Sequence, residues 1–199
     1  MLKPYLYRNL KEAGCDEAGR GCLAGPVVAA AVIFPKNYRN NLINDSKKLT
    51  SKTREKLRNE IISSAIAWSV AFVDNREIDA LNILRATIKA MHLALDGLSV
   101  KPEFILIDGN KFFPYRGIGY KTIVRGDSLF LSIAAASILA KTFRDDYMIK
   151  IHNEYSVYGW DKNKGYSTAL HREAIKSYGI SPYHRKSFTL FESQMKIDF

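Results

Sequence analysis

The sequence predicts an α/β fold, in which a β-sheet of mixed strand directions is flanked by helices and followed by a helical extension. Three segments with the apolar, partly β-branched composition of strands come first, at residues 11–17, 26–34 and 65–73. Helical and strand patterns then alternate as far as residue 152, which is typical of a sheet covered by helices. The opening hairpin or meander, joined to these later units, gives the sheet its mixed strand directions.

One helix is predicted before the third strand and one after it. The first covers residues 52–64 and can be capped by Thr50 or Ser51. Apolar residues then recur at three- and four-residue steps from Ile78 to Leu98. This spacing predicts one long amphipathic helix.

The middle of the chain predicts two more strands and a second long helix. A strand buried on both faces is expected at 104–107, because a wholly apolar run ends there at Asp108. A short strand at 120–124 leads into a helix from residue 128 to about residue 152. The inner face of this helix carries small side chains, so its backbone can lie close to a sheet or to a neighbouring helix.

The composition excludes several classes of protein. An apolar fraction of 47% over 199 residues allows a sizeable core and excludes disorder as the main theme. The longest apolar run, 27–34, is too short to cross a membrane. Cys15 and Cys22 are too few for a disulfide framework or a structural zinc site. We expect a soluble, cytoplasmic monomer with no membrane partner, whose core (1–154) and C-terminal extension (155–199) pack as one structural unit.

The charge of the chain points to an anionic partner. The formal net charge is +10, and the basic residues are concentrated at 36–58 and 110–126. Such a pattern is typical of a surface that binds a polyanion, although a merely solvated surface is the alternative.

Four carboxylates stand out by their positions. Asp16 and Glu17 end the first strand before a glycine-rich turn, Asp108 ends the buried strand, and Asp127 opens the long helix. If the first and fourth strands are neighbours, Asp16 and Asp108 lie side by side at one edge of the sheet. Side chains alternate along a regular strand, so Asp16 and Glu17 can share a site only where the strand ends or is distorted.

Acids clustered without basic partners repel one another, and a hard divalent cation is the usual remedy. A set of carboxylates without Cys or His favours Mg²⁺ or Mn²⁺ over zinc. Two such ions could activate a water and stabilise the leaving oxygen in phosphodiester hydrolysis, so a nuclease is the natural interpretation. Two simpler interpretations stay open, in which Asp127 only caps its helix and Asp108 only makes a turn. Asp145 lies too far along the helix from Asp127 for both to hold one metal pair.

Motifs in the same order along nearly the whole chain resemble those of ribonuclease HII, the type 2 ribonuclease H. They are Asp16-Glu17-Ala18-Gly19-Arg20-Gly21, Asn44-Asp45-Ser46-Lys47-Lys48-Leu49, Ile107-Asp108-Gly109, Gly126-Asp127-Ser128, Ser132 to Lys141, Asn163-Lys164-Gly165-Tyr166 and His184-Arg185-Lys186-Ser187-Phe188. The resemblance implies an RNase H-like core with a C-terminal helical extension. It also implies that Asp16, Glu17, Asp108 and Asp127 are the catalytic metal ligands of a two-metal site for Mg²⁺ or Mn²⁺.

The resemblance further implies the substrate. Family members hydrolyse the RNA strand of RNA–DNA hybrids and nick duplex DNA 5′ to an embedded ribonucleotide, leaving 3′-hydroxyl and 5′-phosphate ends. By the same resemblance, Gly19, Arg20 and Gly21 would read the 2′-hydroxyl, Tyr166 would pack on the following deoxyribose, and Lys47 would lie near a phosphate. Ribonucleotide excision repair and removal of RNA primers are the roles that this activity implies.

Other basic residues are further candidates for phosphate contacts. They are Lys141, Arg144, Lys164, His184, Arg185 and Lys186. His92, His152 and His171 lack metal-ligand spacing, and we expect them at the surface or in helix packing.

Two other functions are considered, and one additional partner. The chain could be a basic nucleic-acid-binding module with structural acids, but acids that face a polyanion weaken binding unless a cation intervenes. It could also be a different metal-dependent nuclease or phosphoryl-transfer enzyme, against which the ribonucleotide-reading motifs argue. The tail, residues 194–199, faintly resembles the short peptides by which bacterial replication proteins bind the sliding clamp.

Overall fold

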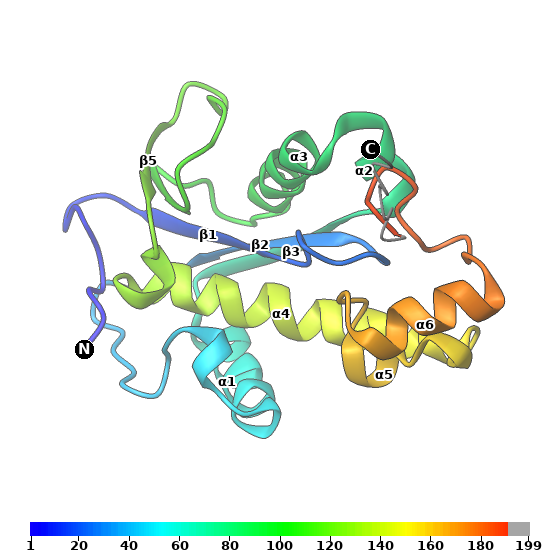
Figure 1. Cartoon of the computed structure of the whole chain (residues 1–199). Helices are drawn as coiled ribbons and strands as arrows, with labels where there is room; N and C mark the ends of the chain where they lie inside the picture. The colour runs from blue at the N-terminus through cyan, green and yellow to red at the C-terminus, as the bar shows by residue number, and fades with distance from the viewer. Residues whose placement is uncertain (191–199) are drawn as a thin grey trace, which may run out of the picture.

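The structure is a computed structural model, and it describes residues 1–190. One five-stranded sheet, in the order β3-β2-β1-β4-β5, forms the centre of the molecule (Figure 1). The strands are β1 (Glu12–Ala18), β2 (Val27–Ile33), β3 (Ala67–Val73), β4 (Phe104–Asp108) and β5 (Gly119–Ile123). The first three pair antiparallel, and β4 and β5 continue the sheet parallel to β1. The predicted α/β fold with mixed strand directions is therefore confirmed.

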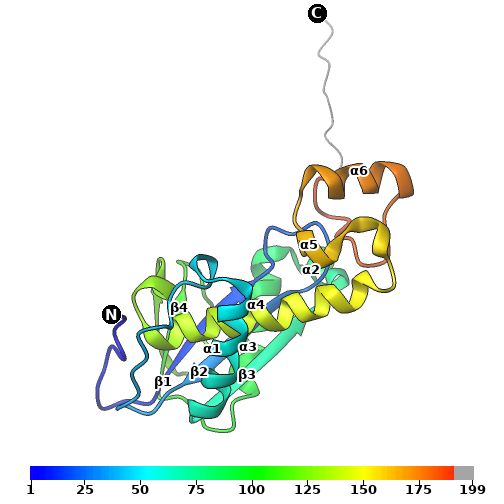
Figure 2. The same cartoon turned by 90° about the horizontal axis from the view of Figure 1, so that it is seen from below.

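Helices cover both faces of this sheet (Figures 1 and 2). On one face lie α1 (Ser51–Ser64) and α4 (Leu131–His152), and on the other lie α2 (Asn75–Leu81) and α3 (Ile83–Asp96). Strand β2 is buried along its whole length, because its alternate residues enter the two apolar cores on either side of the sheet. Burial of both faces is what a run as apolar as Val-Val-Ala-Ala-Ala-Val-Ile predicts.

The long helix predicted from Ile78 to Leu98 is two helices, so that prediction was wrong. The chain breaks at Asn82, whose φ of 69° is incompatible with a continuous α-helix. Its side-chain oxygen accepts hydrogen bonds from the backbone N–H groups of Leu84 and Arg85 and so caps α3. The apolar spacing continues across the break because both helices face the same core.

The second long helix begins at Leu131 rather than at residue 128. Residues Gly126–Ser128 form a separate 3₁₀ turn, and Asp127 lies inside this turn. Helix α4 approaches the sheet closely at Gly14, where a Cβ would lie 2.3 Å from the backbone carbon of Ser132. The small residues on the inner face of α4 therefore permit contact between two backbones, as the sequence predicts.

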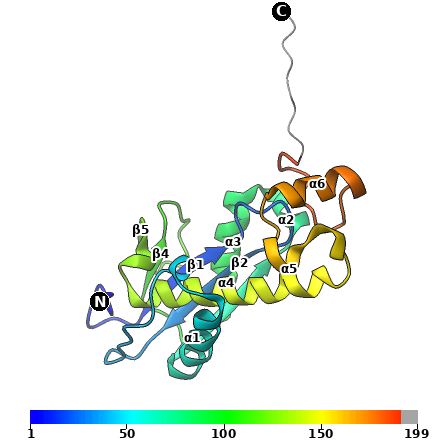
Figure 3. The same ribbon diagram turned by 60° about the horizontal axis from the view of Figure 1, so that its bottom comes forward.

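The extension packs at the far end of α4 (Figures 2 and 3). It contains η3 (Ser156–Tyr158), α5 (Trp160–Asn163) and α6 (Ala169–Tyr178). A separate apolar core joins it to the rest of the chain, with Trp160 and Ile175 packed near Met148 of α4. Within residues 1–190, no helix is long and apolar enough to span a membrane. The tail segment 194–199 lies outside the described residues.

Candidate active site

Parallel pairing of β1 with β4 brings two of the predicted acids together. The register pairs Cys15 with Ile107, so the next residues along the two strands are Asp16 and Asp108. Both lie where their strands end at the same edge of the sheet, as expected for parallel neighbours. The carboxylate of Asp108 accepts a 2.6 Å hydrogen bond from the backbone N–H of Gly126. This bond ties the turn that carries Asp127 to the same edge.

A cavity of about 220 Å³ opens at this edge. Its lining includes eight of the nine residues singled out from the sequence, the exception being Asp127. These eight are Asp16, Glu17, Gly19, Arg20, Gly21, Lys47, Asp108 and Tyr166. Asp127 lies next to this cavity, because its Oδ2 is 3.8 Å from Nζ of Lys47, which is part of the lining.

Asp16 and Glu17 reach the cavity although they are adjacent on β1. Asp16 lies against Ser137 of α4, on one side of the sheet. Glu17 also lines a smaller hollow beside Met91 of α3, on the other side, and its Oε1 lies 3.2 Å from Nη1 of Arg20. Because β1 ends at Ala18, both side chains stand at the margin of the sheet and can border one cavity.

The carboxylates make this edge electrostatically unfavourable. Burial raises the pKa of Asp16 well above its usual range, and the charges of Glu17 and Asp108 raise it further. Burial likewise raises the pKa of Glu17, although Arg20 opposes this effect. Burial and the charge of Asp108 raise the pKa of Asp127. The acids therefore disfavour one another's ionisation, and Arg20 beside Glu17 and Lys47 beside Asp127 do not fully offset this effect.

This donor set fits a hard divalent cation. Among residues 1–190, no three His, Cys, Asp or Glu side chains already stand at the spacing of an assembled metal site. The available ligands are nevertheless carboxylate oxygens, which Mg²⁺ and Mn²⁺ prefer. Asp16 is buried beside a hydroxyl and another acid, so a cation would relieve the repulsion that raises its pKa.

The two glycines of the loop 19–21 differ in what the fold requires of them. Gly19 has a φ of +95°, and a Cβ there would overlap the side chain of Arg144. A Cβ on Gly21 would meet no protein atom within 4 Å. The fold therefore requires glycine at position 19, whereas at position 21 it leaves open space beside the cavity.

Tyr166 faces this loop from the extension. A short antiparallel bridge pairs it with Cys22, and the residue is 42% exposed. The ring lies 5.9 Å from Nζ of Lys141. The cavity thus has an acidic edge formed by the sheet, a glycine loop and an exposed aromatic ring.

Comparisons with known proteins agree with this arrangement. Residues 13–191 match the family model described as Ribonuclease HII. The chain belongs to the ribonuclease HII family. It is 58% identical to ribonuclease HII of Bacteroides thetaiotaomicron over 200 residues and 57% identical to that of Parabacteroides distasonis over 199 residues, each covering both chains completely.

Solved structures give the same result. The ribonuclease H2 of Pyrococcus horikoshii superposes with a TM-score of 0.78 at 28% identity, covering 90% of this chain and 94% of the other. Ribonuclease HII of Archaeoglobus fulgidus, solved as a complex with PCNA, has a TM-score of 0.76 at 27% identity, with 94% and 98% covered. This ribonuclease HII is accordingly a ribonuclease H, a hydrolase that acts on RNA–DNA hybrids with divalent metal ions.

Three of the proposed phosphate contacts were wrong in this ribonuclease HII. Arg144, His184 and Arg185 are fully buried and bond inside the protein. Arg144 donates to the carbonyl oxygens of Pro26, Ala24 and Lys164. None of the three is available to a phosphate, because their donors and acceptors hold loops together.

Arg185 is a structural residue of the site that the sequence did not reveal. Its guanidinium donates to the carbonyl oxygens of Gly19, Arg20 and Gly25, at 2.7, 2.9 and 3.0 Å. A buried guanidinium with several backbone acceptors fixes a loop more firmly than a point charge can. The extension therefore holds the glycine loop in place.

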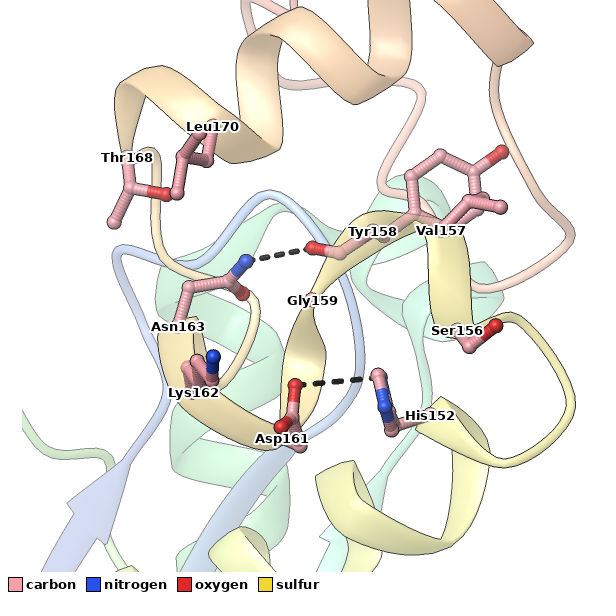
Figure 4. A pocket seen from close by; sticks show the side chains of 10 residues that line it. All are labelled: His152, Ser156, Val157, Tyr158, Gly159, Asp161, Lys162, Asn163, Thr168 and Leu170. Carbon is pink, nitrogen blue, oxygen red and sulfur yellow. Dashed lines mark hydrogen bonds and ion pairs between the residues drawn. The ribbon is translucent and has the colours of Figure 1, made fainter.

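A larger hollow, of about 710 Å³, lies in the extension of this ribonuclease HII (Figure 4). The only acid in its lining, Asp161, lies 3.5 Å from Nδ1 of His152, and Asn163 bonds to the carbonyl oxygen of Tyr158. Exposed Leu170 borders its mouth. No cluster of acids faces this hollow, so the smaller cavity at the sheet edge has the chemistry of a hydrolase site.

Proposed function

We propose that this ribonuclease HII cuts the phosphodiester bond on the 5′ side of a ribonucleotide, in hybrids and in duplex DNA with a single embedded ribonucleotide, leaving 3′-hydroxyl and 5′-phosphate ends. Asp16, Glu17, Asp108 and Asp127 would hold two Mg²⁺ or Mn²⁺ ions. Bound ions would supply an activated water and stabilise the leaving oxygen. The observation that carries this proposal is the acidic edge formed where β1 and β4 end together.

The protein's own residues select the substrate. Open space at Gly21 allows a sugar to approach the backbone, and peptide groups of the loop 19–21 can hydrogen-bond a 2′-hydroxyl. Tyr166 presents an exposed ring that can pack on the next deoxyribose. Lys47, 82% exposed and 3.8 Å from Asp127, would meet a phosphate beside the acids. Excision of misincorporated ribonucleotides and removal of primers are the cellular roles that follow.

One assay tests the reaction and the substrate together. An end-labelled DNA duplex with one ribonucleotide is incubated with Mg²⁺, with Mn²⁺ and with chelator, and the product ends are mapped. We expect a metal-dependent nick immediately 5′ to the ribonucleotide and no cut in all-DNA duplex. A bound but uncut duplex would favour the binding-module interpretation, in which the acids are structural.

A sliding clamp is proposed as a further partner, through residues 194–199. The support is the composition of this segment and the complex of the Archaeoglobus fulgidus relative with PCNA. In a pull-down with purified bacterial clamp, deletion of the last six residues should abolish binding. Unchanged binding by the shortened chain would refute this contact.

A further inference from the structure

Behind Tyr166 lies a buried series of hydrogen bonds between aromatic rings. Trp160, His171 and His184 are all fully buried in the extension. Trp160 Nε1 lies 3.0 Å from His171 Nε2. His171 Nε2 also lies 3.2 Å from His184 Nε2. On its other side, Nδ1 of His171 lies 2.9 Å from the backbone carbonyl oxygen of Tyr166.

The partners of these rings determine where the protons lie. The backbone N–H of Ser181 can only donate, and it lies 2.9 Å from Nδ1 of His184. His184 Nδ1 is therefore an acceptor, and the proton of this neutral ring is on Nε2, which donates to His171. The indole N–H of Trp160 can also only donate, so the two donors share the single lone pair of His171 Nε2. The remaining proton of His171 is then on Nδ1 and is donated to Tyr166.

Both rings are held neutral in this arrangement. Burial lowers the pKa of His171 and of His184, and the neighbouring His171 lowers the pKa of His184 further. A second proton on either ring would place two donors against each other. The series therefore has one direction, which ends at the Tyr166 carbonyl.

The bridge to Cys22 and the nearby Lys141 hold Tyr166 on one side only. The residue is 42% exposed, and the short stretch that carries it connects α5 to α6. The backbone N–H of Tyr166 donates to the carbonyl oxygen of Asn163, and the His171 bond holds its carbonyl. Figure 4 shows Asn163 and Thr168, which lie on either side of this stretch. The direction of the exposed ring thus depends on backbone bonds at both ends of the residue.

We propose that His171, oriented by His184 and Trp160, is a positioning residue that fixes Tyr166 and thereby sets the preference for a ribonucleotide followed by a deoxyribonucleotide. This inference rests on the proposed role of Tyr166 in substrate contact. His171 itself touches no reacting atom. It acts only through the carbonyl that its Nδ1 proton holds.

Two substitutions separate positioning from simple packing. In His171→Asn, the amide nitrogen can replace Nδ1 as the donor to Tyr166, whereas the contacts with Trp160 and His184 are lost. In His171→Gln, the amide can replace Nε2, whereas the donor to Tyr166 is lost. Both variants lose a similar amount of ring packing, so they are matched controls for each other.

The readout is the ratio of kcat/KM on a single-ribonucleotide duplex to kcat/KM on a long RNA–DNA hybrid, with the folded fraction measured by circular dichroism. We expect His171→Gln to lower this ratio about tenfold, the effect of one lost hydrogen bond in a positioned group, and His171→Asn to lower it much less. Tyr166→Ala should lower it at least as much as His171→Gln. If the Gln and Asn variants give equal ratios while Tyr166→Ala lowers the ratio, the role of His171 is refuted and the proposed contact of Tyr166 with the substrate stands.

An unchanged ratio in Tyr166→Ala would overturn both this inference and the proposed contact of Tyr166 with the substrate. If the variants fail to fold, the wild-type protein still provides a test. Long-range ¹H–¹⁵N spectra of histidine-labelled protein should show the proton of His171 on Nδ1 and that of His184 on Nε2. The opposite positions would overturn the inference.

Discussion

Arg185 donates a 2.7 Å hydrogen bond from Nη2 to the carbonyl oxygen of Gly19, 166 residues earlier in the chain. A second nitrogen of the same group bonds to the carbonyl oxygen of Arg20. In a trans peptide the N–H points away from the C=O. By holding these two carbonyls, Arg185 turns the N–H groups of Arg20 and Gly21 the other way, toward the exposed side of the loop.

Arg185→Lys is therefore expected to impair the loop although it keeps the charge. A lysine cannot reach three carbonyl oxygens in the fork geometry of a guanidinium. We expect the free energy of unfolding to fall by about 2 kcal/mol and cleavage at single ribonucleotides to fall more than that loss of folded protein explains. Urea unfolding and the nicking assay measure the two effects. Arg76→Lys, at an exposed position of α2, is the control and should change neither by much.

Gly21→Ala should leave the fold intact and damage the activity. A methyl group at this position has open space in the protein but would occupy the space proposed for the sugar. Displacing a substrate by about 1 Å can cost about 100-fold in rate, so we expect a loss of that order in kcat/KM with an unchanged melting temperature. Gly14→Ala is the contrasting variant, because its methyl group meets the backbone of α4 and should destabilise the fold by about 3 kcal/mol. Full activity of Gly21→Ala would refute the proposed approach of the sugar.

Asp16→Asn and Asp108→Asn should abolish turnover while leaving folding and duplex binding largely intact. Each removes a proposed metal ligand, and we expect kcat to fall more than about 100-fold. Without metal, Asp16→Asn should raise the melting temperature, because it removes a buried charge that its acidic neighbours disfavour. Asp146→Asn, whose acid pairs with Arg58, is the control outside the proposed ligand set. Retained cleavage in either of the first two variants would contradict the metal assignment.

Acid should weaken the extension through its buried histidines. Burial and His171 lower the pKa of His184 from 6.5 to about 4, and burial and Arg172 lower the pKa of His171. A group whose pKa is lower in the folded state contributes stability above its unfolded pKa, and this contribution is lost as the pH falls. The free energy of unfolding should therefore decline between about pH 6.5 and pH 4.

Comparison with His184→Asn isolates this contribution from that of the carboxylates. Asparagine keeps an acceptor for the N–H of Ser181 and cannot be protonated in this range. The decline measured by urea unfolding should be shallower in the variant. The same slope in both proteins would show that His184 does not carry the effect.

Much of the acidic edge could be predicted from the sequence, because the relevant pattern is local. A wholly apolar strand that ends in Asp108, and a first strand that ends in Asp16 and Glu17, needed only parallel pairing to meet. Asp127 was less accessible to this reasoning. The start of the long helix was placed three residues early, which made Asp127 look like a cap rather than part of a separate turn.

The buried cations could not be predicted from charge, because charged residues usually lie at the surface. Arg144 offered one local signal, since it falls on the same helical face as Ala140 and Met148, four residues away on either side. Arg185 offered none of this kind. Its partners are carbonyl oxygens of a loop at the other end of the chain. Every residue has a backbone carbonyl, so the sequence does not indicate which ones a distant side chain will bind.

The dependence of the glycine loop on Arg185 has a consequence for synthesis of the protein. The ribosome makes the chain from its N-terminus, so the four carboxylates emerge well before residue 185. A nascent chain that has completed the sheet and α4 possesses the acids, but its loop 19–21 lacks the guanidinium that orients it. Selective recognition of a ribonucleotide would thus arise only after Arg185 has been made and has packed against the loop.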